Sequence, residues 1–157
     1  MHLGWLVLGA AALGLGGAAD AQQKPPSFMS IKAGKARMRT GPGRNYPASW
    51  LYQRRDLPVK VIDAYGEWRK IEDPDGAQGW MQANLLDGKR TAIVMGGITE
   101  MRSAANFTAH INWRAAPGVV GAIRNCGGGW CWFEVGGRGG YVEQSHIWGT
   151  DPGETLG

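Results

Sequence analysis

Apolar and polar residues alternate over short stretches of this chain, most clearly between residues 57 and 61. Leu57, Val59 and Val61 are separated by polar or imino positions, which is the period of a half-buried β-strand. Asp73-Pro74-Asp75-Gly76 is a turn sequence between two apolar segments, so we expect residues 68–72 and 79–82 to form a hairpin. After residue 21, the apolar spacing of a helix is never sustained for ten residues. The pattern predicts short strands joined by tight turns.

The chain also repeats itself, with an offset that shrinks from 63 to 61 residues. The recurring landmarks are Met38-Arg39-Thr40 with Met101-Arg102-Ser103, Gly66-Glu67-Trp68 with Gly128-Gly129-Trp130, and Gly79-Trp80 with Gly140-Tyr141. We interpret them as two copies of one unit, at residues 32–88 and 96–149. A single helical turn is expected near the end of each copy, at residues 83–85 and 144–146. The segments outside the copies are then a linker at 22–31, a linker at 89–95 and a C-terminal tail at 150–157.

Composition narrows the fold class further. Glycine fills 26 of the 157 positions, there are eight tryptophans, and 43% of the residues are hydrophobic. Glycine far above its usual share of about 7%, without a Gly-X-Y period, is typical of compact β domains with many tight turns. The hydrophobic content argues against a disordered chain. We therefore expect an all-β protein made of two small barrels, each of about five strands.

The first 21 residues have the pattern of an export signal. Residues 3–19 carry no charge, and Ala19-Asp20-Ala21 places small residues at the −3 and −1 positions of a signal peptidase site. We expect cleavage after Ala21, a periplasmic or secreted protein, and no stable membrane insertion after cleavage. The apolar run is shorter than the ~20 residues that span a bilayer. The alternative is an uncleaved membrane anchor.

Positive charge is concentrated in the first copy. Without residues 1–21 the chain keeps 17 basic and 12 acidic residues, and residues 32–60 alone hold eight Lys or Arg residues against one acid, Asp56. A basic surface on an exported protein favours anionic envelope polymers, acidic lipid headgroups or acidic proteins as partners. Export argues against nucleic acid, although the charge alone would allow it. The alternative is a basic face that is merely solvated.

The segment Ala36-Arg37-Met38-Arg39-Thr40-Gly41-Pro42-Gly43, followed by Asn45-Tyr46-Pro47, resembles the opening of bacterial SH3-like domains. The family's later Gly-x-Trp, Asp-Gly and Gly-Trp elements follow in order at Trp68, Gly76 and Trp80. The second copy is similar to the second half of a group of exported tandem SH3-like proteins. The resemblance implies two tandem SH3-like β-barrels. Because the second copy lacks Gly-Pro-Gly and Tyr-Pro, the resemblance supports a ligand groove at this loop in the first copy and leaves the second copy open.

Cys126 and Cys131 are the only cysteines, and they flank Gly127-Gly128-Gly129-Trp130. In a hairpin they lie on adjacent strands, close enough for the ~5.5 Å Cα separation of a disulfide, and an oxidising envelope favours the bond. We expect a structural disulfide. Free thiols are one alternative. A redox or metal role is another alternative. The four intervening residues do not match a thioredoxin motif, and the only nearby histidines, His110 and His146, do not match a zinc site.

The remaining candidate chemistry is aromatic and basic. The six candidate ligand-binding residues are Arg39, Arg44, Tyr46, Trp50, Tyr65 and Trp68, which fall in or beside segments that border the peptide groove of SH3-like barrels. An aromatic ring stacks on a sugar face or a proline, and an arginine binds a carboxylate. For Trp68, Trp80 and Trp130 a place in the core is the favoured interpretation. The two rings expected to be exposed are those of Tyr46 and Trp50.

These features favour a non-catalytic binding module of the periplasm or cell envelope that recognises peptidoglycan or an envelope peptide or protein. The alternative is a protein-binding regulatory or accessory factor without glycan affinity. Two barrels fill the chain after residue 21, so we expect no separate catalytic domain. An enzyme, such as a thiol-dependent hydrolase, is therefore the third choice. We expect a monomer with no cofactor and no metal.

Overall fold

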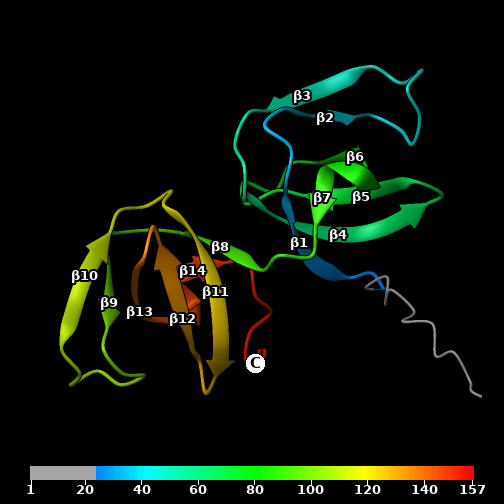
Figure 1. Ribbon diagram of the computed structural model, residues 1–157. Coiled ribbons are helices and arrows are strands. Elements are labelled where there is room, and N and C mark those ends of the chain that lie inside the picture. The colour runs from blue at the N-terminus through cyan, green and yellow to red at the C-terminus, as the bar shows by residue number, and fades with distance from the viewer. Residues whose placement is uncertain (1–23) are drawn as a thin grey trace, which may run out of the picture.

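The computed structural model describes residues 24–157, which form two all-β units (Figure 1). The first unit contains β1 (Ser27–Ile31), β2 (Ala36–Arg39), β3 (Ala48–Tyr52), β4 (Pro58–Tyr65), β5 (Trp68–Glu72), β6 (Gln78–Gln82), the 3-10 helix η1 (Ala83–Leu85) and β7 (Leu86–Asp87). The second contains β8 (Thr91–Val94), β9 (Thr99–Arg102), β10 (Ile111–Ala115), β11 (Val120–Gly127), β12 (Trp130–Val135), β13 (Arg138–Glu143), η2 (Gln144–His146) and β14 (Ile147–Trp148). The all-β prediction is confirmed. The expected export signal at residues 1–21 lies outside the described residues.

The two units have the same topology. Hydrogen-bonded neighbours follow the order β3-β2-β6-β5-β4-β1-β7 in the first sheet and β10-β9-β13-β12-β11-β8-β14 in the second, so each strand has a counterpart seven strands later. The expected hairpin is present, because β5 pairs with β6 from Trp68 opposite Gln82 to Glu72 opposite Gln78. Both expected helical turns are 3-10 helices. The internal repeat of the sequence is therefore a repeat of the structure.

Both segments that we interpreted as linkers contain a strand. β1 lies within residues 22–31 and pairs with β4 and β7, and β8 lies within residues 89–95 and pairs with β11 and β14. The linker interpretation is wrong for these strands. Each forms by pairing with strands far away in the sequence, and the local pattern of apolar residues does not show such pairing. Each unit thus has seven strands rather than about five.

Each unit has its own core, and the tryptophans lie at its margin. Ile71 and Met81 are fully buried in the first unit, as are Cys131 and Phe133 in the second. The three tryptophans expected in the core are only half-buried: Trp68, Trp80 and Trp130. Successive strand residues point to opposite faces, so a tryptophan directly before buried Met81 or Cys131 lies on the outer face. The core interpretation of these tryptophans is wrong.

Two glycines at equivalent positions allow strands to approach closely. A Cβ at Gly79 would lie 2.8 Å from the carbonyl oxygen of Arg39, and a Cβ at Gly140 would lie 2.8 Å from the carbonyl carbon of Met101. Any other residue would push β6 away from β2, or β13 away from β9. This close approach explains why glycine recurs at this landmark in both copies.

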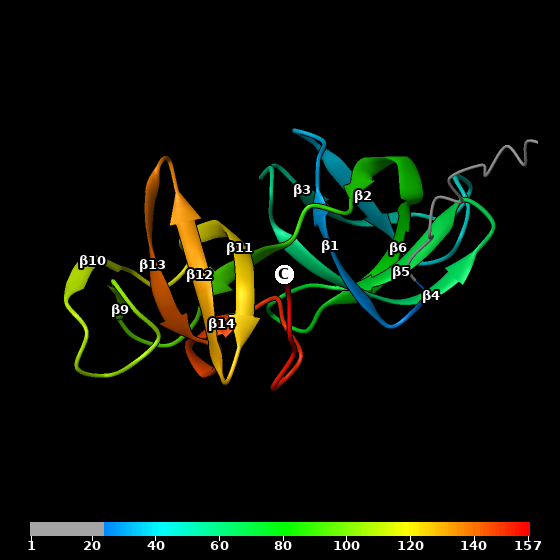
Figure 2. The same cartoon turned by 60° about the horizontal axis from the view of Figure 1, so that its bottom comes forward.

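The two units contact each other through apolar and polar groups. The side chain of Ile93 belongs to the core of the first unit, although β8 pairs within the second sheet. The rings of Phe28 and Trp148 meet edge to face, with centroids 5.2 Å apart. Arg90 lies over the Phe28 ring and donates two hydrogen bonds, of 2.7 and 3.0 Å, to the Glu154 carboxylate. The C-terminal segment that carries Glu154 therefore lies between the units (Figure 2).

Candidate ligand groove

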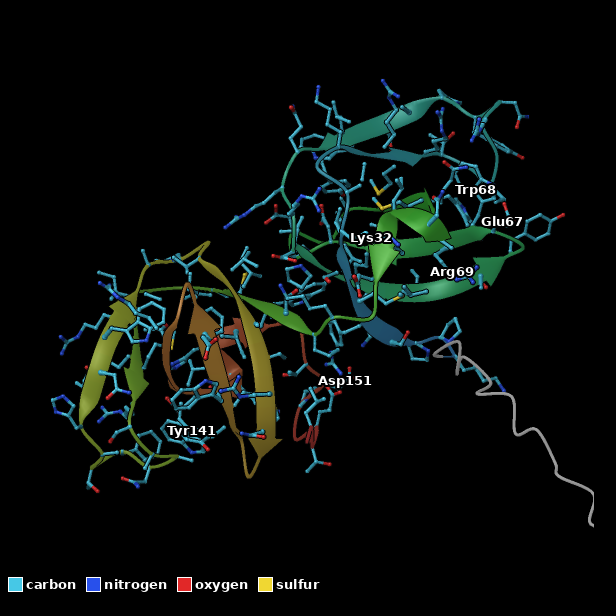
Figure 3. All side chains as sticks on the ribbon, viewed as in Figure 1. Lys32, Glu67, Trp68, Arg69, Tyr141 and Asp151 are labelled. Carbon is cyan, nitrogen blue, oxygen red and sulfur yellow. A yellow bond between two sulfur atoms is a disulfide. The ribbon has the colours of Figure 1, made fainter. Side chains whose placement is uncertain are left out.

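A groove of about 290 Å³ lies on the first unit between β2, β3, β5 and the residues around η1. Its lining residues are Lys35, Arg37, Arg39, Leu51, Trp68, Gln82 and Leu85. Lys35, Arg37 and Arg39 alternate with buried neighbours. The three basic side chains therefore share the outer face of β2 and of the residue just before it. Leu51 pairs with Arg37 across β2 and β3. Trp68 lies on the side of β5 that faces the β2–β3 hairpin (Figure 3).

Arg39 also holds the loop between β2 and β3. Its Nη1 donates a hydrogen bond of 2.8 Å to the carbonyl oxygen of Tyr46. The Tyr46 ring covers Gly41, where a Cβ would lie 2.4 Å from the ring carbons. The Tyr46 ring thus leaves no room for a side chain at Gly41. This contact explains why Gly-Pro-Gly and Tyr-Pro occur together.

The groove is strongly cationic. Three of its seven lining residues are basic and none is acidic. None of the ion pairs formed within residues 24–157 involves Lys35, Arg37 or Arg39. A single exposed ion pair contributes little binding energy, but several cations around one groove act together on an anionic group. The half-buried Trp68 ring adds an apolar surface beside them.

The structure brings two of the six predicted residues into this groove, Arg39 and Trp68. Tyr46 is linked to it through the bond between its carbonyl oxygen and Arg39, and its ring is exposed as expected. Arg44 is exposed in the same loop but does not line the groove. Tyr65 is 67% exposed and lies opposite Trp68 at the end of the β4–β5 hairpin. The structure thus leaves Arg44, Tyr46 and Tyr65 outside the lining of the groove.

Trp50 lies elsewhere, at a cleft of about 500 Å³ between the two units. Its side chain is 60% exposed, as expected, and its ring centroid is 6.5 Å from that of Tyr52. The Tyr52 hydroxyl donates a hydrogen bond of 2.9 Å to Asp73, whose other oxygen accepts bonds from the N–H groups of Asp75 and Ala77. Burial, and then this hydrogen bond, raises the pKa of Tyr52 well above its ordinary value. Asp73 is thus a turn residue that also fixes the wall of the cleft.

The loop of the second unit keeps the same backbone although it lacks Gly-Pro-Gly and Tyr-Pro. Three backbone hydrogen bonds recur at equivalent positions, and Arg102 Nη1 donates 2.9 Å to the carbonyl oxygen of Ala109. Ala104 and Ala109 stand where the first copy has Gly41 and Tyr46, so loss of the ring makes room for a methyl group. A groove of about 480 Å³ lies here, with a lining that includes Ile98, Glu100, Arg102, Arg114, Trp130, Glu143 and His146. The second copy therefore has the groove that the sequence left open.

Cys126 and Cys131 form a disulfide between the paired strands β11 and β12, with Cα atoms 4.1 Å apart. The expected structural disulfide is confirmed. The N–H of Leu156, in the C-terminal tail, donates 3.0 Å to the Cys126 carbonyl oxygen. Within the part of the chain that the structure describes, no group of three or more His, Cys, Asp or Glu side chains could hold a metal ion. No helix among the same residues has the length and apolar character needed to cross a membrane.

Sequence reasoning missed most of the groove lining. Lys35 and Arg37 repeat at period two with Arg39, a signal that places all three on one strand face. Gln82 and Leu85 belong to a segment more than forty residues away from β2, and only the pairing of β2 with β6 brings them near. Leu51 gives no signal beyond its place in a short apolar run.

Residues 32–88 and residues 96–149 each match the family model of the bacterial SH3 domain. The chain belongs to the bacterial SH3 domain family. Its two SH3 units are the two structural repeats, each with one of the grooves described above. Bacterial SH3 domains are protein- and peptide-binding modules, and a disulfide in such a protein fits an extracytoplasmic location.

Other comparisons add little to this assignment. No curated protein shows significant similarity to the chain. The structure of NlpC2 from Trichomonas vaginalis is similar over 78% of this chain and 48% of that chain, with 12% sequence identity and a TM-score of 0.33. The chain thus spans less than half of that structure.

Proposed function

We propose that this protein is a non-catalytic binding module of the periplasm or cell envelope, and that the groove of its first SH3 unit binds an anionic part of peptidoglycan. The observation that carries the proposal is the set of three basic side chains around Trp68, in a lining without any acidic residue. Such a groove attracts an anion and offers it an aromatic surface. It contains no pair of carboxylates for acid–base chemistry, so it is suited to binding rather than to catalysis.

Peptidoglycan carries both of the chemical groups that this groove suits. Its stem peptides bear carboxylates, which arginine binds with two parallel hydrogen bonds. Its sugars present apolar faces, which stack on an indole ring such as that of Trp68. An envelope peptide or protein that combines an acidic residue with an apolar one has the same chemistry and is the second candidate. The apolar leader at residues 3–19 and the disulfide support an envelope location.

The test is binding of residues 22–157 to purified sacculi at low and at high salt. Binding should weaken as salt rises, because exposed charges are screened over ~8 Å at physiological ionic strength and over ~3 Å at 1 M. Arg37→Ala should weaken binding about tenfold, the usual effect of removing a charged hydrogen-bond donor. Arg138→Ala is the matched control, since it removes the same charge from an exposed position that lines neither groove.

Three results would contradict the proposal in different ways. Equal losses in Arg37→Ala and Arg138→Ala would show that overall charge, and not the groove, binds the sacculus. Failure to bind sacculi, together with salt-sensitive capture of one envelope protein that Arg37→Ala abolishes, would replace peptidoglycan by a protein partner. Turnover of a peptidoglycan fragment by the pure protein would overturn the non-catalytic assignment.

A further inference from the structure

The grooves of the two SH3 units are the same site in two versions. Every residue that lines the first groove has a counterpart, 61 to 63 positions later, that lines the second. Two of these pairs keep their chemistry, Arg39 with Arg102 and Trp68 with Trp130. The arginine and the tryptophan are therefore the constant parts of this site.

The arginine is oriented in the same way in both units. Nη1 of Arg39 donates to the carbonyl oxygen of Tyr46, and Nη1 of Arg102 donates to the carbonyl oxygen of Ala109, the equivalent loop position. This contact uses one end of each guanidinium. The other end, at Nη2, has its own N–H donors for a second partner.

The second partner differs between the units. In the second unit it is Glu100, whose Oε2 accepts a hydrogen bond from Nη2 of Arg102 and whose Oε1 lies 3.4 Å from Nη2 of Arg114. Glu100 occupies the strand position that Arg37 occupies in the first unit. There, among the described residues, no acidic side chain pairs with Arg39.

We propose that Glu100 fills, in the second unit, the carboxylate subsite that is open in the first. The group that the first groove binds is then a ligand carboxylate that accepts hydrogen bonds from Nη2 of Arg39, and in the second groove the protein's own Glu100 takes that place at Arg102. The proposal rests on the proposed function for the first groove. It adds the chemical class of the bound group and a latent site in the second unit.

A tethered carboxylate keeps a free carboxylate from binding Arg102. The effective concentration of a group held by a short flexible tether is on the order of millimolar. A free carboxylate must compete with that concentration, and Arg114 strengthens the internal contact further. In the first unit the corresponding strand position adds a positive charge, Arg37, which attracts the ligand instead of replacing it.

The experiment uses a simple carboxylate and exchanges the two grooves. The probes are acetyl-glycyl-glycine, which has one free carboxylate, and its C-terminal amide, which has none. Binding is followed by NMR at the indole N–H signals of Trp68 and Trp130, one ring from each groove. In the unmodified protein the acid should shift the Trp68 signal alone, and the amide should shift neither.

The variants reverse this preference. Arg37→Glu should weaken the response of Trp68 about tenfold or more, because the new carboxylate accepts the hydrogen bonds that Arg39 would donate to the ligand. Glu100→Gln should make the Trp130 signal respond to the acid. Glu100→Ala tests the same site without a side chain that could itself occupy the groove, and it should also make Trp130 respond. Glu134→Gln removes a carboxylate of the same unit that lines neither groove, so it should leave Trp130 silent. The dispersion of the NMR spectrum shows that each variant is folded.

The outcomes separate this inference from the proposed function. A Trp130 signal that stays silent in both folded Glu100 variants overturns the latent site, whatever the sacculus assay shows. A Trp68 signal that ignores the acid while sacculi still bind through Arg37 overturns the carboxylate subsite and leaves the proposed function standing. Silence at Trp68 together with no sacculus binding overturns both.

Discussion

At the scale of single residues, Arg39 combines a structural contact with an open binding end. Nη1 of Arg39 holds the loop carbonyl of Tyr46, while the rest of its guanidinium remains available in the groove. Arg37 makes no such loop contact. The two neighbouring arginines therefore tolerate replacement differently.

Arg39→Lys should weaken sacculus binding about tenfold, because a single ammonium group cannot replace the planar fork at both contacts. Amide hydrogen exchange at residues 40–47 should also become faster, since the loop loses its side-chain bond. Arg37→Lys keeps the charge and loses no loop contact, so its affinity should stay within about twofold. Equal behaviour of the two variants would show that Arg39 acts only as a positive charge.

Gly140→Ala should destabilise the second unit by about 1–3 kcal/mol, as expected when a methyl group is forced against packed backbone. Gly97→Ala is the control in the same unit, because a Cβ at Gly97 would meet no atom within 4 Å. Urea unfolding of the two variants measures the difference. A loss no larger in Gly140→Ala than in Gly97→Ala would mean that β13 and β9 can separate without cost.

At the scale of elements, the β11–β12 hairpin is reinforced near its turn. Its strands pair with each other, the disulfide joins them, and the C-terminal tail hydrogen-bonds to Cys126. The equivalent hairpin of the first unit, β4–β5, has Ala64 and Arg69 at the cysteine positions and pairs without a covalent link. The second unit is thus the one that depends on oxidation.

Replacing both cysteines by serine should lower the stability of the second unit by about 2 kcal/mol, the entropy released when so short a loop is no longer closed. Hydrogen exchange should accelerate in β11 and β12 and change little in β4 and β5. Both cysteines are replaced because a single serine would leave the other cysteine as an unpaired thiol. Equal acceleration in both units would show that the bond stabilises their contact rather than the hairpin.

Elements with a strong local pattern could be predicted from the sequence, and elements defined by distant pairing could not. The β5–β6 hairpin follows from its turn residues, and the disulfide follows from its hairpin position. β1 and β8 were missed because their partners are remote strands. In the groove, Arg39 and Trp68 were found through motifs, whereas Gln82 and Leu85 depend on how β6 meets β2.

At the scale of the whole molecule, the C-terminal tail fastens the two units together. Arg90 lies between the units, and its guanidinium binds the Glu154 carboxylate and the Gly149 carbonyl oxygen. Lys60 of the first unit also pairs with Asp151, at 2.7 Å. These contacts depend on ionised carboxylates, so they respond to acid.

The hydrogen bond from Arg90 lowers the pKa of Glu154 below its ordinary value of 4.5, although partial burial of the carboxylate opposes this shift. The folded state therefore binds this proton less readily than the unfolded state does. The stabilisation is fully present above about pH 4.5 and is lost as the pH falls through the lowered pKa. The stability difference between the unmodified protein and Glu154→Gln should accordingly be constant near neutral pH and shrink below pH 4.5.

Urea unfolding at a series of pH values measures this difference. Glu67→Gln is the control, because Glu67 is exposed and forms none of the ion pairs of residues 24–157. A stability difference for Glu154→Gln that is independent of pH would contradict a role for the ionised carboxylate.

Ile93 makes the first unit depend on the second. Its backbone is part of the second sheet, yet its side chain fills the core of the first, so the first half does not contain its whole core. A chain cut just before β8 yields a first fragment whose core lacks one side chain and a second fragment that supplies it, as the parts of a split reporter do. Expressed together they should reassemble, whereas the first fragment expressed alone should be less stable than it is within the whole chain. The two units share one topology, yet they are not interchangeable parts.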